Sequence, residues 1–156
     1  MKNVVKDCIE GIARERQRVW LNEPEEIRTA RKVKGTYGNR YIPLEMARGD
    51  FHAVTDALSN LIGSLNTEGV EFATLKIITR NVLEFYQNRM MGWYQQHGIV
   101  GMLRNVQGVL DSVENKEEYR QLIEEMIRYF GKLSWWFDLA TPWLELNQLY
   151  DLIVPE

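Results

Sequence analysis

Apolar residues recur at steps of three and four positions along almost the whole of this 156-residue chain. In an α-helix this spacing places the apolar side chains on one face, so it constrains the fold more than any other feature. The first example lies near the N-terminus, where Val5, Cys8/Ile9, Ile12/Ala13 and Val19/Trp20 mostly recur at this spacing. Period-two alternation, which marks half-buried strands, is not convincing anywhere, and only residues 36–42 leave room for a short extended piece. The sequence therefore predicts an all-α fold.

Turn-forming residues divide the N-terminal part into two helices and a loop. The stretch 21–24 interrupts the first helix, and Pro24 suits the first turn of a second one. This short helix is expected to end before Gly35. The loop 35–43 follows, because Gly38 and Asn39 tolerate turn geometry and Pro43 disfavours a helical conformation at Ile42.

Further helices are predicted after the loop. Asp50 is the expected N-cap of a helix that continues to Leu65. The longest helix is expected from about residue 66 to 97, closed by Gly98, and residues 99–113 form the next. Asn115 with Glu118 has the spacing of a capping box. Residues 141–142, Thr-Pro, are expected to start a separate last helix that runs to about residue 153.

Charge is distributed unevenly along the chain. Residues 1–48 hold eleven basic and seven acidic residues, a net charge of +4, whereas residues 49–156 hold eight and fifteen, a net charge of −7. Such asymmetry is typical of a basic segment that meets a polyanion. We therefore predict a basic helix–turn–helix arm (1–48, with hinge loop 35–43) followed by an antiparallel four- or five-helix bundle (49–156).

No metal or cofactor site can be assembled from the residues. Di-metal carboxylate bundles need Glu-x-x-His, but neither His52 nor His97 has a glutamate three positions before it. His97, before Gly98, is expected to be a helix-end residue. Two acidic pairs imitate half of the magnesium pattern of helical nucleotide pyrophosphatases: Glu68 with Glu71, and Glu114 with Glu117. Because neither pair is completed, both are expected to be helix-dipole partners. We predict no metal and no cofactor.

Catalytic and targeting motifs are also missing. The single cysteine, Cys8, cannot form an intramolecular disulfide and is expected to be a buried, inert thiol. No stretch resembles a signal peptide, and none approaches the roughly 18 apolar residues of a membrane span. The sequence thus predicts a chain that is not an enzyme and does not cross a membrane.

The basic N-terminal segment is the strongest functional signal in the sequence. Arg14 and Arg18 lie four positions apart and share a helical face. Rows of arginine can bind phosphate oxygens without reading base edges, and tyrosines can pack beside sugars or bases. The predicted nucleic-acid-binding residues are Arg14, Arg18, Arg28, Arg31, Lys32, Lys34, Arg40, Tyr37 and Tyr41. The alternative is a solvated face that nearby glutamates, such as Glu15, neutralise.

An arginine-rich helix–turn–helix arm before a helical bundle resembles the major coat proteins of filamentous archaeal viruses. The resemblance rests on the stretches 13–18 (ARERQR), 28–34 (RTARKVK) and 35–43 (GTYGNRYIP). It implies a structural virion protein that self-assembles and wraps double-stranded DNA through the phosphate backbone. The implied partners are copies of the chain itself and a paralogous coat subunit, and the implied location is the virion, or otherwise the cytoplasm.

Tryptophans are the candidates for contacts between copies. Trp135 and Trp136 are adjacent, so their side chains point about 100° apart on a helix and cannot share one narrow face. One of them can therefore reach a subunit contact, where tryptophan is enriched. The predicted self-assembly residues are Trp93, Trp135, Trp136 and Trp143. The alternative is a wide core face on a central helix.

Two other functions fit the same pattern. One is a small helical accessory subunit of a prokaryotic RNA-binding defence complex, which would use the basic face on single strands. The other is a helical protein-binding regulator, whose working surface would be the acidic body.

Overall fold

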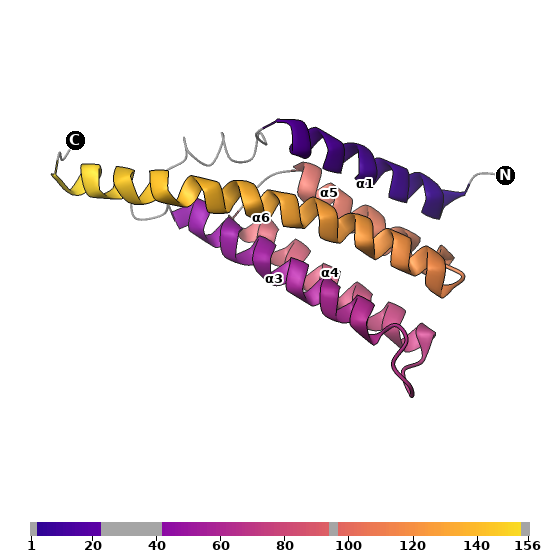
Figure 1. Cartoon of the computed structure of the whole chain (residues 1–156). Helices are drawn as coiled ribbons and strands as arrows, with labels where there is room; N and C mark the ends of the chain where they lie inside the picture. Colours follow the sequence, from indigo (N-terminus) through magenta and orange to yellow (C-terminus); the bar gives the residue numbers. More distant parts are fainter. Residues whose placement is uncertain (1–2, 23–41, 94–96, 154–156) are drawn as a thin grey trace.

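The computed structural model describes residues 3–22, 42–93 and 97–153 (Figure 1). Within these ranges the chain forms α1 (Val4–Leu21), α3 (Ile42–Ser64), α4 (Phe72–Trp93), α5 (His97–Val109), the 3-10 turn η1 (Leu110–Ser112) and α6 (Lys116–Ile153). These residues include no strand. The prediction of an all-α helical bundle is confirmed. The predicted second helix and nearly all of the predicted loop 35–43 lie outside the described residues.

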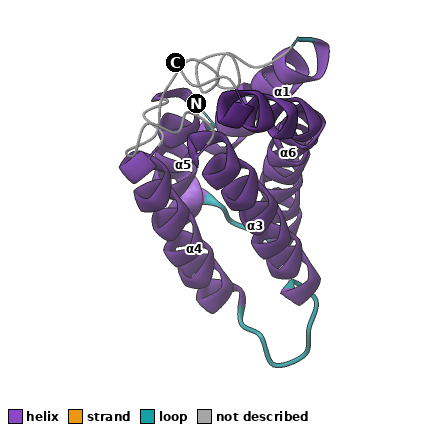
Figure 2. Cartoon of the chain, turned by 90° about the vertical axis from the view of Figure 1, so that its left-hand side faces the viewer, coloured by secondary structure: helices purple, strands orange, loops and turns teal. Residues whose placement is uncertain are grey.

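The helices pack side by side in a ring. α6 contacts α1 on one side and α3 on the other, α3 contacts α4, α4 contacts α5, and α5 contacts α1. Figure 1 shows α6 running the length of the molecule between α1 and α3, and Figure 2 shows the helices surrounding a common centre. Every helix can therefore bury its apolar stripe against two neighbours.

The largest buried side chains come from α6 and from α3, which lies antiparallel to it. Tyr119, Tyr129, Phe130 and Phe137 of α6 are each at most 1% exposed. Phe51 of α3 contacts two of them, with its ring centroid 6.0 Å from that of Phe130 and 5.2 Å from that of Phe137. These rings form the centre of the hydrophobic core.

Helix α1 belongs to the bundle rather than to a separate arm. Its apolar stripe is buried in the core that the other helices share. Trp136 Nε1 of α6 donates a hydrogen bond of 2.6 Å to the Val19 carbonyl oxygen, and Arg16 Nε lies 2.8 Å from Glu125 Oε2. This placement differs from the predicted arm, because burial of the α1 stripe needs the surface of α6. α3 also runs without a break across the predicted boundary at residue 48.

The start of α3 differs from the expected one. Asp50 is not an N-cap, because the helix begins eight residues earlier, at Ile42. Pro43 lies in the first turn, where a missing N–H costs no helical hydrogen bond, so it does not keep Ile42 out of the helix. Asp50 is instead buried inside the bundle, where Arg89 Nε of α4 lies 2.8 Å from its Oδ1. The carboxylate thus connects two helices.

The predicted longest helix is shorter at both ends. α4 begins at Phe72, after a connection in which Gly69 has a φ of 86°, a value that favours glycine. α4 ends at Trp93, and α5 starts at His97, so His97 and Gly98 open a helix instead of closing one. Glu68 therefore lies in the connection, and Glu71 lies just before α4.

The expected cap of α6 is confirmed, but the expected break at residue 141 is wrong. Asn115 Oδ1 accepts a hydrogen bond of 2.9 Å from Glu118 N, and Glu118 Oε1 accepts one of 2.9 Å from Glu114 N. The helix then continues through Thr141 and Pro142 to Ile153. A proline removes one hydrogen bond from a helix, and here it does not end it.

A buried hydroxyl pair joins α4 to α6 and gives a testable asymmetry. Thr79 Oγ1 donates to the Leu75 carbonyl oxygen at 2.7 Å, so Tyr119 Oη, 2.6 Å away, must donate to Thr79 Oγ1. Tyr119→Phe removes one hydrogen bond and is expected to cost about 1 kcal/mol. Thr79→Val leaves the Tyr119 hydroxyl buried without a partner and is expected to cost up to about 3 kcal/mol.

Urea unfolding of the two single variants and the double variant measures this difference. The double variant is expected to be more stable than Thr79→Val alone, because neither polar group is then left unpaired. Equal stability of the two single variants would contradict the inferred donor direction.

None of the helices in the described ranges is both long enough and apolar enough to cross a membrane.

Candidate functional site

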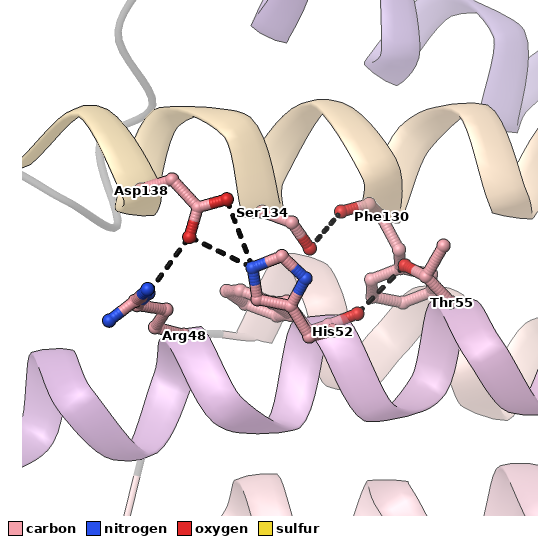
Figure 3. Close-up of polar contacts among 7 residues, drawn as sticks. Arg48, His52, Thr55, Phe130, Ser134 and Asp138 are labelled. Carbon is pink, nitrogen blue, oxygen red and sulfur yellow. Dashed lines mark hydrogen bonds and ion pairs between the residues drawn. The ribbon is translucent and has the colours of Figure 1, made fainter.

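A polar cluster of Arg48, His52 and Asp138 joins α3 to α6 at the surface (Figure 3). His52 Nε2 lies 2.8 Å from Asp138 Oδ1 and 3.0 Å from Oδ2, so the imidazole contacts both carboxylate oxygens. Arg48 Nε donates to Asp138 Oδ1 at 2.8 Å. All three side chains are between 42% and 48% exposed, so solvent reaches the cluster. We call this set the Arg48–His52–Asp138 cluster.

The helices hold these side chains in place through the packing beneath them. Arg48 and His52 lie four positions apart, so they project from the same face of α3. Phe51, next to His52, packs on Phe137, next to Asp138, and this contact brings the two helices together below the cluster. The packing of α3 on α6 thus fixes the positions of the three side chains.

The electrostatics of Asp138 determine which nitrogen of His52 carries a proton. Partial burial raises the pKa of Asp138, but the hydrogen bonds from His52 and Arg48 outweigh this effect and lower the pKa below its usual value. The carboxylate is therefore ionised at neutral pH and can only accept hydrogen bonds. In neutral His52, Nε2 must then be the protonated nitrogen, which leaves the lone pair on Nδ1.

This arrangement can exchange a proton. A carboxylate bonded to one imidazole nitrogen orients the ring and stabilises its protonated form, which is the usual arrangement of a histidine general base. Arg48 uses Nε for Asp138, and its terminal nitrogens form no hydrogen bond with a described residue. Those nitrogens can donate to an anion, since a guanidinium has five N–H donors.

A groove between α1 and α5 is a second surface feature. It has a volume of about 480 Å³, and its lining includes Cys8, Ile12 and Met102, which are buried, together with Gly98 and Gly101. Burial raises the pKa of the Cys8 thiol to about 11, so the thiol is protonated at neutral pH. This confirms Cys8 as a buried thiol and favours a structural role for it.

No group of three acidic, histidine or cysteine residues that could hold a metal ion occurs in the described part of the chain. Neither predicted Glu-x-x-Glu pair becomes part of such a group. Both pairs lie near the start of a helix. Glu68 and Glu71 precede α4, and Glu117 lies in the first turn of α6.

Most of the predicted nucleic-acid-binding residues lie outside the described residues: Arg28, Arg31, Lys32, Lys34, Tyr37, Arg40 and Tyr41. The other two, Arg14 and Arg18, are exposed on α1. Arg18 Nη2 lies 2.9 Å from Glu15 Oε2, so an acidic neighbour partly neutralises it. Contact of these residues with nucleic acid stays a prediction.

The predicted self-assembly tryptophans have different surroundings. Trp136 is half-buried and bonded to α1, whereas Trp135 is 45% exposed and lies below the ammonium group of Lys132, 3.4 Å from its ring centroid. The adjacent pair is thus divided between bundle and surface, as the 100° argument requires. Trp93 and Trp143 lie in α4 and α6, but their side chains are outside the described part. Their contacts with other copies stay a prediction.

The sequence reasoning missed the Arg48–His52–Asp138 cluster. It considered His52 only as a metal ligand and Arg48 only as part of the basic segment. The spacing of Arg48 and His52 was a usable signal, since residues four apart share a helical face. Asp138 lies 86 residues after His52, so only the packing of α3 on α6 could have identified it.

The family comparison assigns the chain to a group of enzyme domains. Residues 5–139 match the model of the cucumopine synthase C-terminal helical bundle domain, a range that contains the whole Arg48–His52–Asp138 cluster. No curated protein matches the chain significantly, and no solved structure does.

This match overturns the functional predictions made from the sequence. The chain is not a coat protein of a filamentous virus, and the prediction that it is not an enzyme is wrong, because the matching domain belongs to an enzyme family. The two alternatives, an RNA-binding subunit and a protein-binding regulator, do not describe that family either. The resemblance rested on a basic segment before a helical bundle, and such a layout does not by itself identify a function. The chain belongs to the family of cucumopine synthase C-terminal helical bundle domains.

Proposed function

We propose that this chain takes part in a synthase reaction that forms cucumopine, and that the Arg48–His52–Asp138 cluster exchanges a proton in that reaction. The product is taken from the name of the family, cucumopine synthase. The observation that carries the proposal for this chain is the bond of His52 Nε2 to both oxygens of Asp138, at 2.8 and 3.0 Å.

The three residues have distinct roles in this proposal. Asp138, ionised and bonded to Nε2, keeps the Nδ1 lone pair of His52 available and stabilises the ring once it is protonated. His52 Nδ1 takes a proton from the reacting molecule and returns it later. Arg48 holds Asp138 through Nε and offers its terminal nitrogens to an anionic group beside the imidazole.

The position of the cluster supports this assignment. Its side chains are almost half exposed, so a molecule from solution, or from another part of an enzyme, can reach them. Its backbone lies on two helices that pack through the central aromatic core, which gives the precision that a proton transfer needs.

Product formation in cells tests the proposal. Extracts of cells that express the protein are compared with extracts of cells that carry the empty vector, and cucumopine is measured by mass spectrometry against an authentic standard. Accumulation only in the expressing cells is expected. Folded protein without any cucumopine above the empty-vector level would contradict the proposed function.

A further inference from the structure

The outer side of α4 carries large apolar side chains that the bundle leaves uncovered. Ile77 is 57% exposed, Ile78 43% and Phe85 57%. Single exposed apolar residues are ordinary, but a gathered set marks an interaction surface. Figure 2 shows α4 at the outside of the bundle. This side of the helix therefore has the properties of a contact surface.

The same side of α4 has almost no charge. At 100° per residue, its exposed residues fall within a sector of roughly 120°. We call this set the α4 face: Thr74, Ile77, Ile78, Asn81, Glu84, Phe85 and Asn88. Glu84 is the one acidic residue among these seven, and none of them is basic. The neighbouring cations are already engaged, because Arg80 lies 2.6 Å from Asp111 and Lys76 donates to the Val113 carbonyl oxygen at 2.8 Å. The partner surface that complements the α4 face is therefore nearly uncharged as well.

The α4 face is close to symmetric about Asn81. Ile77 lies four positions before Asn81 and Phe85 four positions after it. Thr74 and Asn88 lie seven positions before and after. When two copies of this helix lie antiparallel around a two-fold axis at Asn81, each Ile77 meets the other copy's Phe85, and each Thr74 meets the other copy's Asn88. Apolar residues then meet apolar residues and polar residues meet polar residues in these two pairs, whereas Ile78, three positions before Asn81, meets Glu84, three positions after it.

We propose that the α4 face binds a second copy of this chain, with the two α4 helices antiparallel and crossing at Asn81. A two-fold contact uses the same surface on both copies, so it requires a self-complementary pattern. Asn81 meets this requirement, because its amide donates and accepts and can therefore pair with the Asn81 amide of the other copy. This inference does not depend on the proposed function.

Paired charges at position 81 test both the surface and the register. Wild-type protein is expected to sediment at twice the 18.4 kDa of the single chain at high concentration and to dissociate on dilution. Asn81→Lys and Asn81→Asp each place two like charges at the crossing point, and each is expected to weaken association at least tenfold. An equimolar mixture of the two variants is expected to restore the dimer, because opposite charges then meet.

Gln17→Lys, an exposed change on α1, is the control and is expected to leave association unchanged. Sedimentation equilibrium measures every sample, and circular dichroism checks that each variant is folded. Association of the wild type is also expected to change little between low and moderate salt, since the contact carries few charges. Wild-type protein that stays monomeric would overturn the proposal and leave the α4 face to a different protein. Single variants that dimerise like the wild type would overturn it as well.

Discussion

Replacement of His52 by glutamine is expected to lower cucumopine formation by about 10²- to 10⁴-fold, the usual contribution of a positioned acid–base group. Glutamine keeps a side chain that can donate to Asp138, so the bridge between α3 and α6 is preserved. It has no nitrogen that takes up a proton at neutral pH. The loss is therefore expected in product formation and not in stability, and product per unit of folded protein is the quantity to measure.

Arg80→Gln is a matched control for this substitution. Arg80 and Asp111 also form a surface ion pair between two elements, at 2.6 Å, but they lie on α4 and η1. This variant is expected to stay folded, because surface ion pairs contribute about 0–1 kcal/mol to stability. Its effect on product formation is therefore expected to be negligible. Asp138→Asn, which loses the charge that orients His52, is expected to reduce product formation as well. Unchanged formation in His52→Gln would remove His52 from the reaction.

Replacement of Phe51 by alanine is expected to lower the free energy of unfolding by about 3–5 kcal/mol, the usual cost of removing a buried aromatic ring. Phe51 is 0% exposed and contacts the rings of Phe130 and Phe137. The substitution leaves a cavity at the junction of α3 and α6, which close packing of both helices prevents from collapsing. Chemical denaturation followed by circular dichroism measures the loss.

Phe85→Ala makes the same chemical change on the exposed face of α4. Its expected cost is within about 0.5 kcal/mol, because a surface ring has little to lose on truncation. The comparison needs dilute protein, so that association through the α4 face does not contribute to stability. A loss in Phe51→Ala no larger than that in Phe85→Ala would contradict the central position of Phe51 in the core.

Local patterns predicted the fold class and much of the helical content. The three- to four-residue period of α1 predicted an apolar face of Val5, Cys8/Ile9, Ile12/Ala13 and Val19/Trp20. Val5, Cys8, Ile12 and Val19 are buried, whereas Trp20 is 54% exposed. The spacing of Asn115 and Glu118 predicted the start of α6, because a capping box involves only residues three apart. Such features depend on the nearest few residues, so a single sequence is sufficient to predict them.

Helix boundaries set by proline and aspartate were less predictable. Pro43 and Pro142 were both interpreted as breaks or restarts, yet α3 starts one residue before Pro43 and α6 continues through Pro142. Asp50 had the residue type of a cap but became a buried carboxylate paired with Arg89. At Asp50, tertiary packing outweighed the local preference, since burial of a helix face contributes more than a single cap.

The sequence by itself determined that the chain is all-α and where one of its helices is capped, because these properties arise between neighbouring residues. Only the tertiary structure decided that α1 packs on α6 and that His52 meets Asp138, 86 positions away. The physical reason is that helical periodicity specifies which face of a helix is apolar and not which other helix will cover it. Partner choice depends on how all the stripes fit together at once, and the Arg48–His52–Asp138 cluster exists only where that fit brings α3 and α6 into contact.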